Sequence, residues 1–330
     1  MGSLIMQLGR SMSWLILPFL LAGCSRPRPT APSEATSAGA IIPPQPQKAE
    51  FTVGVTLLTR AHEFYKELEE GLRAQAGEEN VKLVVFSGEW NLKQQLSQVQ
   101  DLITKGVDAI VVCPVNSKGV VGAIKEANRA GIPVFTADIA AQGGEVISHI
   151  ASDNRQGGRL AGEYLAKLLE GKGKVIILDQ PTVTSVIDRV AGFLEAVEKY
   201  PGIEIVGRPA VSPGTKARAK EVTDDVLQAH PDLDAIFGSN DDCALGALRA
   251  AEAAGREDLV IIGYDATQEA RAEILKGGPL KADVIQYPRK IGQKTIEVVA
   301  RYLRTGEKPD PWIPIEVGII DQAALQAERG

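Results

Sequence analysis

The sequence contains few cysteines, no block of basic residues and no long apolar run, and each shortage removes a class of protein. Three cysteines among 330 residues cannot build a disulfide framework. The net charge is −6 and the Lys and Arg residues are scattered, which argues against a surface that neutralises nucleic-acid phosphates. No apolar stretch reaches the roughly 20 residues that a helix needs to span a bilayer.

The motifs of common catalytic sites are also missing. No G-x-G-x-x-G follows the first predicted strand, and no serine occupies a nucleophile elbow. His62, His149 and His230 lie far apart in the sequence, without the spacing of metal ligands. We therefore predict that the protein is not an enzyme and uses neither a metal nor a cofactor. Cys113 and Cys243 are expected to be buried free thiols.

The first 24 residues have the layout of a signal peptide. Arg10 precedes a short apolar stretch, Trp14–Leu21, and the small residues of LAGC follow, ending at Cys24. This ending resembles the lipobox of bacterial lipoproteins, which implies that Cys24 becomes the lipidated first residue of the mature chain. The alternative is a hydrophobic N-terminus that is not cleaved. Residues 25–49 are rich in Pro, Ala, Ser and Thr and are predicted to form an extended tether.

The whole sequence is 44% apolar, and from Phe51 onward it alternates short apolar strands with helical patterns. This alternation predicts an α/β fold with two doubly wound, parallel-sheet domains of the Rossmann-like kind. The strands are expected at Phe51–Leu57, Lys82–Phe86, Ala109–Cys113, Val134–Thr136, Lys174–Leu178, Glu204–Val206, Ala235–Phe237, Val260–Ile262 and Ala282–Ile285. The helices are expected at Glu63–Ala76, Leu92–Lys105, Lys118–Ala130, Gln156–Leu169, Val186–Lys199, Lys216–Ala229, Asp242–Ala254 and Pro288–Arg304.

Polar and aromatic residues follow several of these strands, and ligands bind at that edge of a parallel sheet. The stretch from Asp234 to Asp265 predicts a strand, a helix and a second strand. The Asn240 amide and the Asp265 carboxylate follow the two strands at their carboxyl ends. Carboxylates and amides suit a polyhydroxyl ligand, and aromatic faces cover its C–H faces. The aromatic pair could instead belong to the core, the aspartates could cap helices, and the glutamine could lie on the surface. The candidates are Phe64, Tyr65, Asp138, Asn240, Asp265 and Gln286.

Four segments carry a resemblance to a known family: GGEVISHIASDN at 143–154, GSNDDCALGALRAAEAAG at 238–255, VIIGYDAT at 260–267 and VIQYPRKIG at 284–292. With them, the chain resembles bacterial periplasmic sugar-binding proteins of the ribose-binding type, the solute receptors of ABC importers. The resemblance implies two lobes joined by three crossover segments, with the break near Ser152–Asn154. Residues 50–152 plus 287–315 form one lobe, and 153–286 plus 316–330 form the other. Ligand binds between the lobes, which close by hinge motion.

The family's ligand contacts carry over unevenly. All six candidates match family positions, but His62 stands where an Asn is usual. Ile139 and Ile187 fall where arginines are expected, and an aromatic position falls near Gly214. Arg60, His62, Trp90 and Arg189 are candidates to compensate. A deoxysugar or a cyclitol is therefore as plausible a ligand as unmodified ribose.

The resemblance implies a monomeric, lipid-anchored receptor in the cell envelope, periplasmic or extracytoplasmic, that delivers a sugar or polyol to an ABC permease. The alternative is a receptor that presents ligand for chemotaxis or to a membrane sensor kinase, without transport; the sequence does not separate these roles. A transcription repressor core shares this fold but carries a helix-turn-helix before the first strand, where this chain has Cys24 and the tether.

Overall fold

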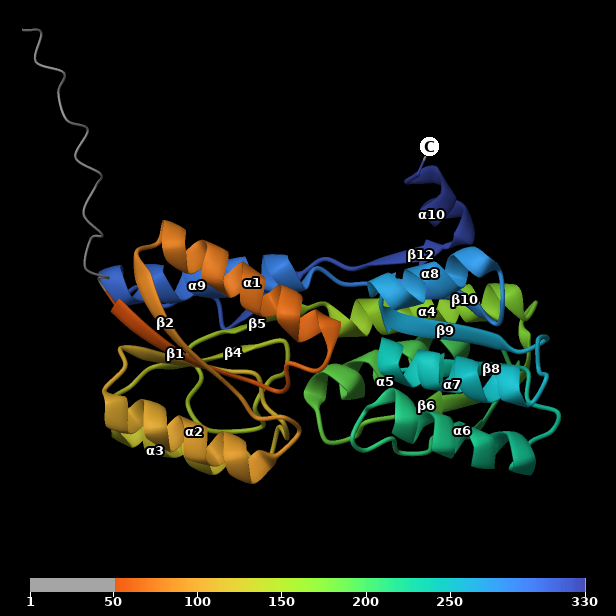
Figure 1. The fold of residues 1–330 in the computed structure, drawn as a ribbon, viewed down its shortest axis with the longest axis horizontal. Helices are drawn as coiled ribbons and strands as arrows, with labels where there is room; N and C mark the ends of the chain where they lie inside the picture. The colour runs from red at the N-terminus through yellow and green to blue at the C-terminus, as the bar shows by residue number, and fades with distance from the viewer. Residues whose placement is uncertain (1–50, 330) are drawn as a thin grey trace, which may run out of the picture. The chain divides into compact units, whose positions relative to one another are not determined.

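The computed structural model describes residues 51–329, which fold into two six-stranded sheets flanked by helices (Figure 1). The predicted signal peptide, the lipidated Cys24 and the tether lie outside the described residues. No helix within residues 51–329 is long and apolar enough to cross a membrane. The structure and its neighbours confirm the predicted fold class.

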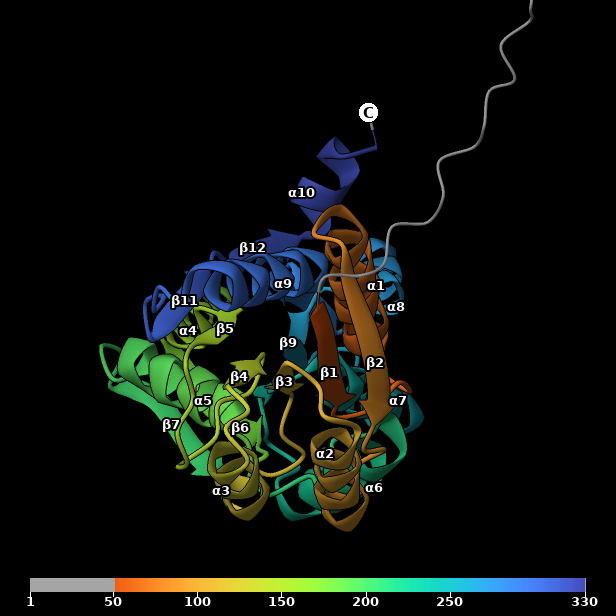
Figure 2. The same ribbon diagram turned by 90° about the vertical axis from the view of Figure 1, so that its left-hand side faces the viewer.

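The first sheet has the strand order β11-β5-β4-β3-β1-β2, and every pairing in it is parallel. We call this sheet and its helices the first lobe. Helices α1 and α9 cover one face, while α2 and α3 cover the other (Figure 2). The elements are β1 (Phe51–Leu57), β2 (Val81–Ser87), β3 (Ala109–Val112), β4 (Val134–Ala137), β5 (His149–Ser152), β11 (Trp312–Ile315), α1 (Glu63–Glu78), α2 (Leu92–Lys105), α3 (Val121–Arg129) and α9 (Pro288–Thr305).

The second sheet has the order β12-β10-β9-β8-β6-β7 and is parallel except for β12. We call it and its helices the second lobe. The elements are β6 (Lys172–Leu178), β7 (Gly202–Gly207), β8 (Ala235–Gly238), β9 (Val260–Asp265), β10 (Leu280–Ile285), β12 (Gly318–Asp321), α4 (Asn154–Leu168), α5 (Thr184–Val197), α6 (Lys216–Ala229), α7 (Asp241–Ala253), α8 (Gln268–Lys276) and α10 (Gln322–Ala327).

Side-chain alternation along the strands explains why both faces of the second sheet are covered. Val175 and Ile177 of β6 belong to one core cluster, which includes residues of α4 and α5. Ile176 and Leu178 of the same strand belong to another, which includes residues of α6 and α7. Because successive side chains of a strand point to opposite faces, a continuous apolar run requires helices on both sides.

The chain passes between the two sheets three times: from β5 to α4, from β10 to α9 and from β11 to β12. The sequence reading missed β5, β11, β12, α8 and α10, and placed the other elements within a few residues. Cys113 and Cys243 are buried and free, as expected.

Candidate ligand-binding site

A cavity of about 40 Å³ lies between the two lobes, and all nine predicted site residues line it. This volume is smaller than the roughly 300–1,000 Å³ of small-molecule sites, so the lobes are nearly closed on one another here. The predicted residues are His62, Phe64, Tyr65, Trp90, Asp138, Arg189, Asn240, Asp265 and Gln286. Sequence reasoning missed six further lining residues: Leu58, Ile139 as an apolar wall residue, Gln180, Val183, Ser185 and Val186.

The start of α1 brings three of these side chains to the cavity. His62 is the N-cap residue, and its Nδ1 accepts a hydrogen bond from the Phe64 amide at 3.1 Å. In the neutral ring, the proton is therefore on Nε2. Phe64 and Tyr65 are buried and meet edge to face, with ring centroids 5.2 Å apart. Both residues belong to the core and also line the cavity, so the pair can pack in the core and contact a ligand as well.

Asp138 follows β4 and is held by the Tyr65 hydroxyl, which donates to its Oδ2 at 2.6 Å. Its backbone has a φ of 65°, in the left-handed region, and the next element in the chain is the strand β5 rather than a helix. Asp138 therefore does not cap a helix, and it lines the cavity. Burial raises the pKa of the Asp138 carboxyl, while the charge of Arg189 and the Tyr65 hydrogen bond act in the opposite direction.

Trp90 lines the cavity from the loop between β2 and α2, with a φ of 60°. The neighbouring Glu89 ties this loop to the end of β1: its carboxylate accepts hydrogen bonds from the Thr59 hydroxyl at 2.8 Å and the Arg60 amide at 3.1 Å. Arg60 itself pairs with Glu69 and does not line the cavity. The predicted compensating role of Arg60 is therefore not supported by its position.

Arg189 of α5, which the sequence analysis named as a candidate to compensate for missing arginines, brings a guanidinium to the cavity. Its Nε donates to Asn154 Oδ1 at 2.9 Å, its Nη1 donates to the Ser239 carbonyl at 2.8 Å, and it stacks 3.8 Å from the Tyr264 ring centroid. Ile187 is 38% exposed and does not line the cavity, whereas Arg189, two residues later, does. Two residues turn a helix by about 200°, which separates the two side chains.

Two glycines allow α4 and α5 to approach closely enough for this arrangement. A Cβ on Gly158 would lie 1.9 Å from the carbonyl oxygen of Arg189, and one on Gly192 would lie 2.0 Å from that of Arg155. Only glycine fits at both contacts. The close packing places Asn154, at the start of α4, beside the Arg189 guanidinium.

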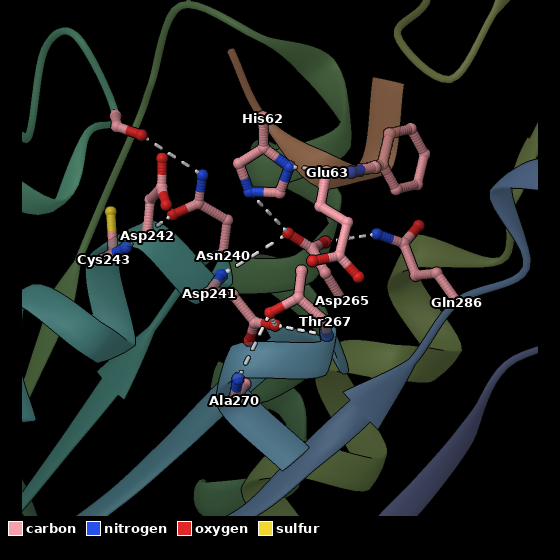
Figure 3. Close-up of polar contacts among 12 residues, drawn as sticks. His62, Glu63, Asn240, Asp241, Asp242, Cys243, Asp265, Thr267, Ala270 and Gln286 are labelled. Atoms are coloured by element: carbon pink, nitrogen blue, oxygen red, sulfur yellow. Dashed lines mark hydrogen bonds and ion pairs between the residues drawn. The ribbon is translucent and has the colours of Figure 1, made fainter. Parts of the chain in front are cut away.

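Asp265 ends β9 and is the most connected group of the site (Figure 3). Its Oδ1 accepts from Gln286 Nε2 at 2.5 Å and lies 3.5 Å from Arg189 Nη1. Its Oδ2 lies 3.3 Å from His62 Nε2, across the cavity. Burial raises the pKa of the Asp265 carboxyl to about 7, although the Arg189 charge and the Gln286 hydrogen bond both favour its ionised form.

Asn240 is both an N-cap and a cavity residue. Its Oδ1 accepts from the Cys243 amide at 2.8 Å, which leaves the Nδ2 group, 3.4 Å from the Gly214 carbonyl oxygen, as the end available to a ligand (Figure 3). Gln286 follows β10, in the second crossing between the lobes, and is buried rather than on the surface.

A pair of buried carboxyls supports the turn that carries Asp265. Asp241 Oδ2 accepts from the Thr267 amide and hydroxyl at 2.7 and 2.6 Å, and Asp283 Oδ1 accepts from the Ala266 amide at 3.1 Å. Their other oxygens both face Gly263, at 2.9 and 2.5 Å from the position of a Cβ. Burial, followed by the neighbouring negative charge, raises the pKa of Asp283. Two carboxyls arranged in this way are expected to hold one proton between them. An aspartate inside the apolar strand β10 was the sequence signal for this pair.

Two buried polar atoms in this cavity have no hydrogen-bond partner among residues 51–329: His62 Nε2 and Gln286 Oε1. The short distance from His62 to Asp265 lacks hydrogen-bond geometry. The cavity thus offers donors and acceptors, among them His62 Nε2, Asn240 Nδ2 and Gln286 Oε1, beside the carboxyls of Asp138 and Asp265, and none of its lining residues is a nucleophile paired with a base. This arrangement can bind a hydroxyl-rich molecule through donors and acceptors on several sides.

Comparison with known proteins identifies the family. The family model of the periplasmic binding protein domain matches residues 53–308. The ribose import binding protein of Salmonella typhimurium is 37% identical over 273 residues, 82% of this chain and 91% of that protein. An ABC transporter periplasmic solute binding protein from Actinobacillus succinogenes, solved with bound D-allose, has a TM-score of 0.77 at 27% identity and covers 84% of this chain and 100% of that one.

The Caulobacter myo-inositol binding protein, solved with myo-inositol, has a TM-score of 0.78 at 26% identity and covers 84% of this chain and 94% of that one. These proteins are binding proteins rather than enzymes. The chain therefore belongs to the periplasmic binding protein family, and within it to the ribose-type sugar-binding proteins.

Proposed function

We propose that this protein is the solute-binding receptor of an ABC importer and that it binds a sugar or related polyol in the cavity between its lobes. The observation that carries the proposal is the convergence of Asp138, Asp265, Arg189 and Gln286 from both lobes on one cavity. The names of the relatives, which import or bind ribose, D-allose and myo-inositol, support the same class of ligand.

The side chains have distinct tasks in this proposal. Asp138 and Asp265 accept hydrogen bonds from ligand hydroxyls, and Arg189 and His62 Nε2 donate to ligand oxygens. Gln286 Oε1 accepts from a further hydroxyl. The rings of Phe64 and Trp90 cover C–H faces of the ligand.

Binding works by closure of one lobe against the other, about the three crossings as hinges. Contacts between the lobes support this step. The Gln268 amide donates to Glu63 Oε1 at 3.0 Å, and His62 of the first lobe faces Asp265 of the second. A ligand that touches both lobes favours the closed arrangement because it gains all its contacts only there. We assign residues 50–152 plus 287–315 to one lobe, and 153–286 plus 316–330 to the other.

The proposal includes the location of the protein. Cys24 carries a lipid anchor, residues 25–49 act as the tether, and the monomeric receptor works in the periplasm or at an extracytoplasmic surface, next to a membrane permease. The basis is the signal-peptide layout ending in LAGC, together with the family of the folded part.

A thermal-shift screen of the purified protein against pentoses, hexoses, deoxysugars, cyclitols and acyclic polyols tests this function. A ligand at 100 times its dissociation constant should add about 2.7 kcal/mol to the free energy of unfolding. Asp265→Ala should abolish this shift, while Asp101→Ala, an exposed position on α2, should retain it. If no sugar or polyol stabilises the protein, the proposed function is wrong.

A further inference from the structure

Part of the cavity lining consists of branched aliphatic side chains. Ile139, which follows Asp138 in the first lobe, is 2% exposed. Val183 and Val186, at the start of α5 in the second lobe, are 4% and 3% exposed. All three belong to one contiguous apolar cluster, which also contains Leu58. We call these four residues the aliphatic wall.

The polar groups next to the aliphatic wall are already paired with one another. The Ala140 amide donates to Thr184 Oγ1 at 2.8 Å, and this hydroxyl donates to the Ala140 carbonyl at 3.1 Å. The Ser117 amide donates to the Thr182 carbonyl at 3.0 Å, and the Thr184 amide donates to Ser117 Oγ at 3.1 Å. A ligand hydroxyl placed against this wall would lose water without gaining a partner from these groups, which is unfavourable.

Polar groups make up the rest of the lining. His62 Nε2 and Gln286 Oε1, two fully buried atoms without a hydrogen-bond partner among residues 51–329, both lie next to Asp265 (Figure 3). Gln180 also lines the cavity, with its Nε2 3.7 Å from Cys243 Sγ, and Asp138 directly precedes Ile139. The cavity therefore combines the aliphatic wall with polar groups, among them those around Asp265 and Arg189.

We propose that the ligand is a deoxysugar or methyl-bearing sugar, whose methyl or methylene group contacts the aliphatic wall while its hydroxyls face Asp265, Gln286 and Arg189. Ile139, Val183 and Val186 are then the residues that determine specificity. This inference rests on the proposed function and narrows its ligand class.

Calorimetric titration of the purified protein with matched sugars tests the inference. The pairs differ by one hydroxyl: L-fucose and L-galactose, L-rhamnose and L-mannose, 2-deoxy-D-ribose and D-ribose. We expect at least one deoxysugar to bind tighter than its parent by about 10- to 100-fold, the discrimination that an apolar pocket achieves against an added hydroxyl. If fully hydroxylated parent sugars bind, and no parent sugar binds more weakly than the deoxysugar paired with it, the inference is wrong and the proposed function stands. If no member of any pair binds and the wider screen also fails, both are wrong.

Variants of the wall test its role separately from folding. Val186→Thr changes little volume and adds a hydroxyl to the wall, so we expect it to reduce the preference for the deoxysugar by about tenfold, within the range for one polar group. Val190→Thr is the matched control, because Val190 lies on the same helix, is 1% exposed and does not line the cavity. It should leave the affinity ratio unchanged. An equal ratio in wild type, Val186→Thr and Val190→Thr would contradict the assignment.

Discussion

Asp265→Asn is expected to stabilise the ligand-free protein above neutral pH while it removes a binding group. The Asp265 carboxyl is 8% exposed, and burial raises its pKa from 3.8 to about 7, against the opposing effects of Arg189 and Gln286. The ionised carboxylate therefore costs the folded state free energy, which the neutral amide of asparagine avoids.

The sign of the pH dependence follows from the two pKa values. The folded-state pKa of Asp265 lies above its unfolded value, so the folded protein binds this proton more tightly. The bound proton stabilises the folded state fully below about pH 4, and this stabilisation is lost as the pH rises through 7. A shift from 3.8 to about 7 corresponds to about 4 kcal/mol. Asp265→Asn should thus gain up to about 4 kcal/mol over wild type at pH 8 and nothing at pH 4.

The hydrogen bonds around Asp265 allow this exchange. In wild type, Gln286 Nε2 donates to Asp265 Oδ1, and Gln286 Oε1 has no partner among residues 51–329. If the Gln286 amide turns over, its Oε1 accepts from the new asparagine Nδ2. The number of hydrogen bonds at this contact is then unchanged, and the Gln286 atom without a partner becomes Nε2 instead of Oε1, so the electrostatic gain is not offset by a lost hydrogen bond.

Urea denaturation at pH 4 and pH 8, without ligand and followed by circular dichroism, measures the effect. Asp101→Asn, at an exposed position of α2, is the matched control and should follow wild type at both pH values. The reasoning is refuted if Asp265→Asn is less stable than wild type at pH 8, or if its difference from wild type is the same at both pH values.

The remaining predictions concern the support of the site and the anchor. Asp283→Asn or Asp241→Asn alone should preserve stability in urea denaturation, because an amide N–H replaces the shared proton. The double variant places two NH₂ groups against each other and should lose about 1–3 kcal/mol of stability. Equal stabilities of the single and double variants would argue against proton sharing. Gly263→Ala should lose about 1–3 kcal/mol in the same assay, since its Cβ would lie 2.5 Å from Asp283 Oδ2. Arg189→Lys should weaken ligand binding at least about tenfold by calorimetry, because lysine lacks the fork that reaches Asn154 and Ser239, and unchanged affinity would rule out this role. Cys24→Ser should move the protein from the membrane fraction to the soluble fraction on immunoblots, and retention at the membrane would contradict lipidation at Cys24.

Elements with a continuous apolar pattern were predictable, and elements without one were not. β1 at Phe51–Leu57 and α2 at Leu92–Lys105 have the predicted bounds, and even the four-residue strand β3 was found from its apolar run. The four residues of β5 begin with His149 and end with Ser152, and β11 contains Pro314, which discourages a strand prediction. α8 buries only Ala270, Glu273 and Ile274, so its apolar stripe is weak. Such segments become strands or helices because their neighbours in the fold pair with them or cover them.

The candidate site was predictable where a polar residue directly follows a strand. Asp138, Asp265 and Gln286 were identified in this way, and the structure places them at one cavity. Arg189 was harder, because a helix face is decided by single-residue steps of about 100° and the family's arginine position was expected at Ile187, two residues earlier. Whether these residues bind ligand remains a prediction.

The sequence by itself determined the α/β class, the two parallel-rich sheets and the polar groups at the strand ends, because these depend on local periodicity and on residue type. Only the tertiary structure decided which groups face one another across the lobes. His62 and Asp265 are about 200 residues apart, yet they lie 3.3 Å apart. The same folding brings Ile139 together with Val183 and Val186 in the aliphatic wall, and it pairs Asp241 with Asp283. Such contacts depend on long-range packing, which no local pattern in the chain records.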